Sequence, residues 1–149
     1  MIHNIKFYTA GFIALAVLIS CAAKQQDLAD VVRPAGTTPY QGDKTELLAY
    51  GEKLWNDPTI GNSSLACGTC HAGNLTFNES FTQPYPHKVA MAENLAGLKS
   101  IDAEQMVQFC MINPMKTKAY PWNSKELAAL TLYVEEVIQP AYIKQQAGE

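Results

Sequence analysis

The spacing of hydrophobic residues along the chain predicts helices rather than a sheet. Leu47, Tyr50 and Leu54 recur at intervals of three and four residues, which places them on one face of a helix. No stretch alternates between hydrophobic and polar residues with the period of two that marks a half-buried strand. The pattern therefore favours an all-α fold, with helices or helical turns over residues 47–55, 91–98, 100–112 and 127–138.

Residues that start and stop helices flank these patterns. Residues 43–46 form a capping-box sequence, residues 123–126 form a similar start signal, and Asp102 is suited to cap the helix between them. The pair at residues 57–58, Asp-Pro, is expected to end the first helix. Pro140 is expected to end the last helix, because proline cannot continue the helical hydrogen-bond ladder.

The first twenty residues have the features of an export signal. Lys6 precedes an apolar run at residues 11–19, which is about as long as a signal-peptide core and too short for a comfortable membrane span. The small residues around Cys21 resemble the lipobox of bacterial lipoproteins, which implies cleavage before Cys21 and acylation of that cysteine. We expect a signal peptide at residues 1–20, a lipidated, solvated tether at 21–42, a helical domain at 43–140 and a tail at 141–149.

Composition narrows the function classes. A length of 149 residues suits one domain, and 48% hydrophobic against 17% charged residues excludes a disordered polyelectrolyte. The formal net charge of −3 leaves little basic surface for wrapping nucleic acid. No apolar run supports a protein with several membrane spans. The strongest chemical signal comes from the four cysteines, at positions 21, 67, 70 and 110.

The sequence Cys67-Gly68-Thr69-Cys70-His71 has the CxxCH pattern of covalent c-type haem attachment. Two thiols three positions apart at a helix start lie close enough together to bond both vinyl groups on one edge of a porphyrin. The following imidazole then lies under the iron, and its second nitrogen needs a hydrogen-bond acceptor. Gly68 and Thr69 are small, which is expected to let the backbone approach the macrocycle. One motif predicts one haem c, held by Cys67, Cys70 and His71.

Two other chemistries share the CxxC spacing. A thioredoxin-like redox pair is expected within a βαβ pattern, and half of a zinc site is expected with a second CxxC or an HxxxH. The sequence contains none of these patterns. Export also favours haem, because c-type haem is attached outside the cytoplasm.

The order of helix, CxxCH, loop, helix, ligand loop and terminal helix resembles the class I cytochrome c fold over residues 43–140. The resemblance implies three to five helices around one covalently attached haem, with the first and last helices crossing closely. Gly51 fits such a crossing, because a glycine inside a helix costs ~1 kcal/mol relative to alanine and is expected to gain a close contact in return. The expected partner is the region of Leu130, Tyr133 and Val134.

The second iron ligand has three candidates, of which Met115 is favoured. Met115 lies in an irregular loop before the last helix, where class I cytochromes place their thioether ligand. It follows His71 by 44 residues, which is enough chain to reach the opposite haem face. A methionine ligand raises the reduction potential. Met91 and Met106 are expected to pack in the core.

Cys110 is the alternative distal ligand. With Cys21 assigned to lipid and the motif cysteines to haem, Cys110 is left unpaired in an exported chain. Residues 109–115, with residues 124–127, resemble the matching stretch of thiosulfate dehydrogenases and of the A subunit of the Sox system, where a cysteine in this region ligates the catalytic haem. That resemblance implies a thiolate-ligated haem of lower potential that handles sulfur compounds. The other interpretation of Cys110 is a buried, inert thiol.

Several further side chains have two interpretations each. His87 is the third candidate ligand, 16 residues after His71, although a surface or propionate-side position is favoured for it. The aromatic residues that either bond a haem propionate or simply pack are Trp55, Tyr85 and Trp122. The lysines that either ring the exposed haem edge, where they would dock an acidic partner, or belong to ordinary solvated surface are Lys88, Lys116 and Lys118.

Together these features predict a membrane-tethered monohaem cytochrome on the periplasmic side of a bacterial membrane. We expect it to transfer single electrons between redox partner proteins of a respiratory or sulfur-oxidising chain, with no nucleic acid partner. The alternative is an enzyme that oxidises sulfur compounds, or the haem subunit of one, with Cys110 as axial ligand and catalytic residue. The electron carrier is favoured over the enzyme.

Overall fold

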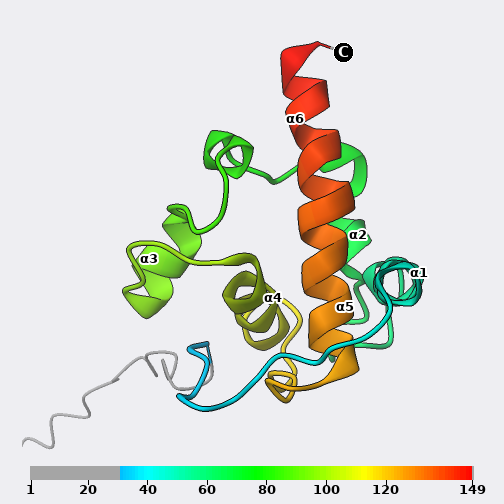
Figure 1. The fold of residues 1–149 in the computed structure, drawn as a ribbon. Helices are drawn as coiled ribbons and strands as arrows, with labels where there is room; N and C mark the ends of the chain where they lie inside the picture. Colours follow the sequence, from blue (N-terminus) through cyan, green and yellow to red (C-terminus); the bar gives the residue numbers. More distant parts are fainter. Residues whose placement is uncertain (1–30, 149) are drawn as a thin grey trace, which may run out of the picture.

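The computed structural model describes residues 31–148, and this part of the chain is helical. Its extended pairing is limited to an isolated bridge between His87 and Ile101, so the predicted all-α fold is confirmed. The predicted signal peptide and Cys21 lie outside the described residues. In chain order (Figure 1) the elements are α1 (Lys44–Trp55), α2 (Cys67–Cys70), η2 (Ala72–Asn74), η3 (Glu79–Thr82), α3 (Ala90–Ala96), α4 (Ala103–Ile112), α5 (Lys125–Tyr133), η4 (Val134–Ile138) and α6 (Gln139–Ala147).

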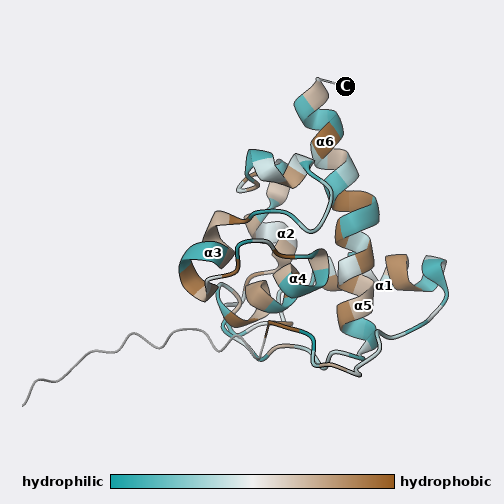
Figure 2. Cartoon of the chain, turned by 60° about the vertical axis from the view of Figure 1, so that its left-hand side comes forward, coloured by the Kyte–Doolittle hydropathy of each residue, from teal (hydrophilic) through white to brown (hydrophobic). Residues whose placement is uncertain are grey.

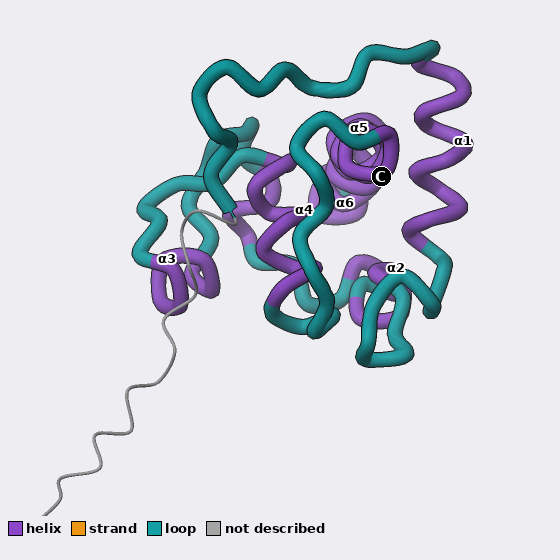
Figure 3. The backbone as a smooth tube through the Cα atoms, turned by 90° about the horizontal axis from the view of Figure 1, so that it is seen from below, coloured by secondary structure: helices purple, strands orange, loops and turns teal. Residues whose placement is uncertain are grey.

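Helix α1 begins where the sequence predicts. The Asp43 side chain accepts a hydrogen bond from the Glu46 backbone N–H at 3.0 Å, which satisfies one of the free donors of the first turn. Leu47 and Leu54 are buried in a cluster that includes residues of α5. The two helices lie side by side in two views (Figures 1 and 3).

The approach of α1 to α5 depends on Gly51. A Cβ atom at Gly51 would lie 2.7 Å from Tyr133 Cβ and closer still to the carbonyl oxygen of Ala129. Backbone atoms cannot move aside as the end of a flexible side chain can, so this approach requires glycine. The expected close contact between the first and last helices is confirmed.

Gly51→Ala is expected to lower the free energy of unfolding by about 1–3 kcal/mol, because the added methyl group forces the two helices apart. A glycine-to-alanine substitution at an exposed helix position would instead raise the free energy of unfolding, since alanine is favoured over glycine in a helix by ~1 kcal/mol. Guanidinium unfolding of the haem-loaded protein measures the difference, with Glu52→Ala at an exposed position of α1 as the control. A Gly51→Ala protein as stable as the parent would contradict this interface.

The terminal helix is longer than the sequence predicts. Ser124 caps α5 as expected, accepting from the Leu127 N–H at 3.2 Å. The prediction that Pro140 ends the helix is wrong, because the helix continues through the π-helical segment η4 into α6, which ends at Ala147 and is capped by Gly148 with φ of +77°. The wider π-helical turn relieves the clash of a proline ring with the carbonyl four residues earlier. Segments α5, η4 and α6 form one long column in Figure 1.

The first turn of helix α6 packs against the rest of the protein. The buried Gln139 side chain donates to the carbonyl oxygens of Phe81 at 3.0 Å and Gln83 at 2.9 Å. Tyr142 is buried in a cluster with Phe81 and Val134. These contacts fix the loop around η3 against the end of the terminal helix, so the chain stays ordered beyond the boundary expected at Pro140.

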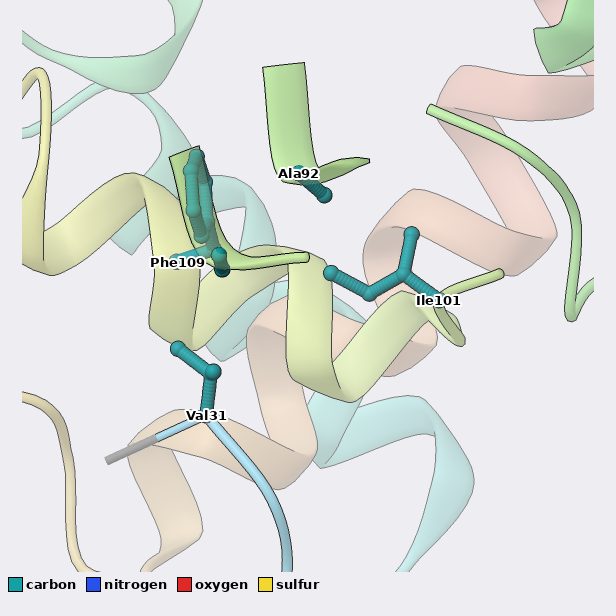
Figure 4. Close-up of a cluster of buried hydrophobic side chains, with 5 residues drawn as sticks. Val31, Ala92, Ile101 and Phe109 are labelled. Carbon is teal, nitrogen blue, oxygen red and sulfur yellow. The ribbon is translucent and has the colours of Figure 1, made fainter. Parts of the chain in front are cut away.

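The described part of the segment before α1, residues 31–43, is irregular as predicted, but Val31 and Arg33 are packed against the helices rather than fully solvated. Val31 is fully buried in a cluster (Figure 4) with Ala92, Ala96, Ile101 and Phe109. Arg33 forms an ion pair with Glu104 and donates to the Trp122 carbonyl at 2.8 Å, with its guanidinium 5.1 Å from the Trp122 ring. These contacts anchor the beginning of the described chain beside α3 and α4.

Helix α4 has the start that the sequence predicts. Asp102 accepts from the Gln105 N–H at 2.7 Å, and the Gln105 side chain accepts from the Asp102 N–H at 3.0 Å.

Hydrophilic and hydrophobic segments alternate along the helices (Figure 2). Within residues 31–148, no helix combines the length and the apolar character needed to cross a membrane.

Candidate functional site

A cavity of about 410 Å³ lies between α2, the loop that follows it, α4, the loop before α5, and the terminal helix. This volume is within the range of small-molecule and cofactor sites. Apolar side chains and sulfur atoms make up most of its wall. Among the described residues that line it, none is Asp, Glu, Lys or Arg.

Helix α2 is one turn that presents two thiols to the cavity. Cys67 and Cys70 both line the cavity, and they are not joined by a disulfide. Burial raises the pKa of the Cys67 thiol to about 11, which keeps it protonated at neutral pH. The CxxC spacing thus brings both sulfur atoms to one wall, as the sequence predicts.

The two residues between the cysteines are small for reasons internal to the protein. A Cβ atom at Gly68 would lie 3.0 Å from Trp55 Nε1. The Thr69 hydroxyl accepts from the Ala66 N–H at 3.2 Å and completes the start of α2. The expectation that both residues let the backbone approach the macrocycle stays a prediction, and these two contacts give each residue a second role.

His71 is oriented by stacking and by one hydrogen-bond chain. Its ring centroid lies 4.2 Å from that of Phe77 and 5.6 Å from that of Trp55. Its Nδ1 lies 3.0 Å from the Thr76 hydroxyl oxygen, which itself donates to the Cys70 carbonyl at 3.2 Å. Because that hydroxyl gives its one proton to the carbonyl, it accepts from Nδ1–H, which leaves a lone pair on Nε2. Burial lowers the pKa of His71 and favours this neutral form.

Thr76 is a functional residue that the sequence did not single out. The sequence does predict that the second nitrogen of His71 needs a partner. The identity of that partner depends on a turn that places Thr76 at a φ of +69°, an unusual value for a β-branched residue. No local sequence signal marks this turn.

Thr76→Val is expected to raise the midpoint potential, because an imidazole without this hydrogen bond donates less electron density to ferric iron. The expected size is up to about a tenfold change in the redox equilibrium, ~59 mV for one electron. Thr76→Ser keeps the hydroxyl and is the matched control. Potentiometric titration of both proteins measures the effect, and equal potentials for Thr76→Val and the parent would refute the role of the hydroxyl.

Met115 lines the cavity in the loop before α5. Its side chain is buried, and its carbonyl oxygen accepts from the Asn62 N–H at 2.9 Å. The Asn62 side chain donates to the Lys116 carbonyl at 2.8 Å, and the Ser63 hydroxyl lies 3.9 Å from the Met115 sulfur. The loop that precedes the CxxCH motif therefore holds the loop that carries Met115.

Cys110 lines the same cavity from α4. Burial raises the pKa of its thiol to about 12. Its carbonyl oxygen accepts from the Met115 N–H at 3.0 Å, so the two candidate distal ligands are neighbours in one folded unit. The fold thus brings all five predicted haem-site residues around one cavity: Cys67, Cys70, His71, Cys110 and Met115.

The structure also places the other side chains that the sequence singled out. His87 is buried at 7% exposure and lines the cavity, which excludes the surface position and leaves the propionate-side position as a prediction. Met91 is 37% exposed rather than in the core, and it lines the cavity together with Met106. Trp122 contacts Arg33 rather than the cavity. The candidate haem-edge lysines are absent from the described cavity lining, and Lys88 forms an ion pair with Glu93 at 2.7 Å.

The residues around the cavity fit a covalently attached haem. Two thiols on one wall match the two attachment points, and a neutral imidazole follows directly after them. Sulfur side chains on α4 and the following loop are suited to bind iron. The apolar remainder of the wall matches an apolar macrocycle.

Comparison with known proteins agrees with this chemistry. A family model described as "SoxA/TsdA, cytochrome c domain" matches residues 50–139, which is more than half of the chain. No curated protein and no solved structure matches the chain.

Proposed function

The chain belongs to the SoxA/TsdA cytochrome c domain family, and on that premise we propose that it is a one-electron carrier tethered outside the cytoplasm. Proteins of this kind carry covalently bound haem c, which supplies a reversible one-electron iron couple. Haem-based electron transfer follows from the family. The carrier role, the tether and the partners are the proposal.

The chain's own residues have defined tasks in this role. Cys67 and Cys70 would hold the haem by thioether bonds, and His71 would bind its iron through Nε2, because Thr76 fixes the tautomer that leaves this nitrogen free. Apolar side chains of the cavity exclude water, which limits reorganisation when the charge of the site changes by one electron. Met115 is the favoured distal ligand. The observation that carries this proposal is its buried thioether on the cavity wall, in a loop held by Asn62.

The proposed tether is lipid on Cys21, which would hold the protein on the periplasmic side of a bacterial membrane. Stable anchoring is expected because several acyl chains on one residue bind a bilayer far more strongly than one chain does. Its partners are then redox proteins of a respiratory or sulfur-oxidising chain that reach the same space. The resemblance of the sequence around Cys21 to a lipobox supports this part of the proposal.

A second candidate function is the oxidation of sulfur compounds with Cys110 as distal ligand and catalytic residue. Two observations favour it: the family match, and the position of the Cys110 side chain on the cavity wall. In this role the sulfur of Cys110 would lie beside the substrate, and the domain would act as an enzyme or as a haem subunit. A thiolate ligand would also lower the reduction potential.

Paired variants separate the two candidates. For the carrier, Met115→Ala is expected to abolish the methionine-to-iron charge-transfer band and the low-spin EPR signal, whereas Cys110→Ser leaves both almost unchanged. For the sulfur enzyme the parent has no methionine-to-iron band, and Cys110→Ser is expected to lose the thiolate-ligated low-spin EPR signal, whereas Met115→Ala leaves that signal almost unchanged. Loss of the six-coordinate spectrum in Cys110→Ser, with Met115→Ala resembling the parent, would reject the carrier with methionine ligation.

A further inference from the structure

The polar groups of the cavity wall are concentrated in one segment. Apart from the CxxCH motif and Trp55, the described cavity-lining side chains with an N–H or O–H donor are Thr76, Asn78, Ser80, Tyr85 and His87. They are all uncharged donors from the loop between α2 and α3. The Thr76 hydroxyl is already bonded to His71 and Cys70. The rest of the segment is therefore the polar end of an otherwise apolar cavity.

His87 is the most tightly held of these side chains. Its backbone N–H donates to the Ile101 carbonyl at 3.2 Å, and its carbonyl accepts from the Ile101 N–H at 2.9 Å. Its ring stacks on Tyr85 with 4.3 Å between centroids and meets Phe81 edge-on at 6.2 Å. Backbone and ring are thus both fixed, and the residue is 7% exposed.

One ring nitrogen of His87 has no partner although it is buried. Its Nδ1 makes no hydrogen bond of normal geometry within the described residues, although backbone groups of Gln83 and Pro84 lie close to the ring. A buried, unpaired nitrogen destabilises the folded protein, because it has lost its hydrogen bonds to water without gaining a replacement. Native proteins pair nearly all such groups, so an unpaired one at a cofactor cavity indicates a partner on the cofactor.

Haem c has the matching chemistry, because its apolar macrocycle carries two carboxylates. A buried carboxylate needs hydrogen-bond donors, and no Lys or Arg is among the described residues that line this cavity. We propose that His87 donates a hydrogen bond from its ring to a carboxylate of the haem and so orients that edge of the cofactor. An anionic substrate would offer the same acceptor chemistry, and the experiment below separates the two sources.

The position of His87 argues against a role as iron ligand. The rings of His71, Phe77 and Phe81 stack nearly parallel in a row, with 4.2 Å between successive centroids, and His87 meets the end of that row. His87 thus continues the wall that begins at His71. The sulfur candidates come from α4 and the loop that follows it. The assignment depends on haem c alone, and it holds for either distal ligand.

The test compares His87→Phe and His87→Gln in the full-length, haem-loaded protein. Redox-difference infrared spectra with haem carboxylates labelled by ¹³C report on the hydrogen bond, and potentiometry reports on its electrostatic effect. We expect His87→Phe to shift the labelled carboxylate band and to lower the midpoint potential. The expected decrease is up to ~59 mV, which corresponds to a tenfold change in the one-electron redox equilibrium. His87→Gln, which keeps a side-chain donor, is expected to retain most of the parent band position.

Three results would overturn the proposal. Loss of the low-spin spectrum in His87→Phe would make His87 an iron ligand. An unchanged carboxylate band in His87→Phe would show that His87 only packs against its neighbours and makes no hydrogen bond to the haem carboxylate. A His87 ring signal that responds to added thiosulfate or sulfite, but not to the haem carboxylate label, would assign the nitrogen to a substrate anion. If His87→Phe does not fold, the reduced parent protein decides the matter, because a nuclear Overhauser effect must connect the His87 ring N–H with the propionate methylene protons.

Discussion

A protein with Cys67 and Cys70 both replaced by serine is expected to carry no haem and to lose its fold. The two thiols are the covalent attachment points, and the cavity they line has a volume of about 410 Å³. At roughly 24 cal/mol per Å³ of unfilled apolar cavity, that volume corresponds to about 10 kcal/mol. A whole domain is stable by only about 5–15 kcal/mol. The haem is therefore a structural part of the core as well as the redox centre.

Circular dichroism and intact-mass measurement of the double variant test this expectation. Cys110→Ser is the matched control, because it removes a cavity thiol but keeps both attachment points. We expect that control to retain its haem mass and its helical spectrum. A double variant with the helical content and thermal stability of the parent would show that the helices do not need the cofactor.

Gln108→Met is expected to lower the free energy of unfolding by about 2–4 kcal/mol, since two backbone groups lose their partner and each costs about 1–3 kcal/mol. The fully buried Gln108 side chain donates to the Tyr120 carbonyl at 2.7 Å and accepts from the Tyr120 N–H at 2.8 Å. Methionine has a similar volume but can make neither bond. The loop between α4 and α5 thus loses its attachment to α4.

The same substitution is expected to disturb the distal ligand. Two further hydrogen bonds hold this loop to the end of α4, from the Met115 N–H to the Cys110 carbonyl and from the Thr117 N–H to the Met111 carbonyl, each 3.0 Å long. Without the Gln108 clamp, a larger high-spin fraction is expected in the haem spectrum of Gln108→Met.

Denaturant unfolding and the haem spectrum of Gln108→Met are compared with those of Gln83→Met. Gln83 is exposed, and its side chain makes only a 3.3 Å bond to a neighbouring hydroxyl. The control is expected to change stability by less than about 0.5 kcal/mol. Equal stabilities for the two variants would contradict the role of Gln108 as the clamp of the ligand loop.

Local sequence signals predicted the elements of the fold. The caps at Asp43, Asp102 and Ser124 are present, and the hydrophobic spacing gave the four helical regions. Gly51 was identified from its cost inside a helix, and the close approach that it permits is in the structure. These features depend on residues that lie within one or two helical turns of each other, so the local sequence is sufficient to predict them.

The features that the sequence did not predict depend on contacts between distant segments. Pro140 is a stop signal locally, yet a π-helical turn and the bonds of Gln139 to the loop around Phe81 carry the helix past it. Val31 lies in a segment of tether-like composition but is buried against α3 and α4. Nothing in the local sequence distinguishes Thr76 and Gln108 from other polar residues, because their partners, His71 and Tyr120, are brought to them by the fold. The CxxCH motif located the site, whereas its supporting residues needed the structure.

The covalent attachment of one haem through Cys67 and Cys70 is the claim on which the function depends. Mass spectrometry of the matured protein tests it most directly, by intact mass and by fragmentation of the peptide that contains residues 67–71. The account predicts the added mass of a single haem, located on both cysteines and accompanied by the absorption spectrum of a c-type cytochrome. A matured chain whose motif peptide has two unmodified thiols, or a disulfide between them, would contradict it.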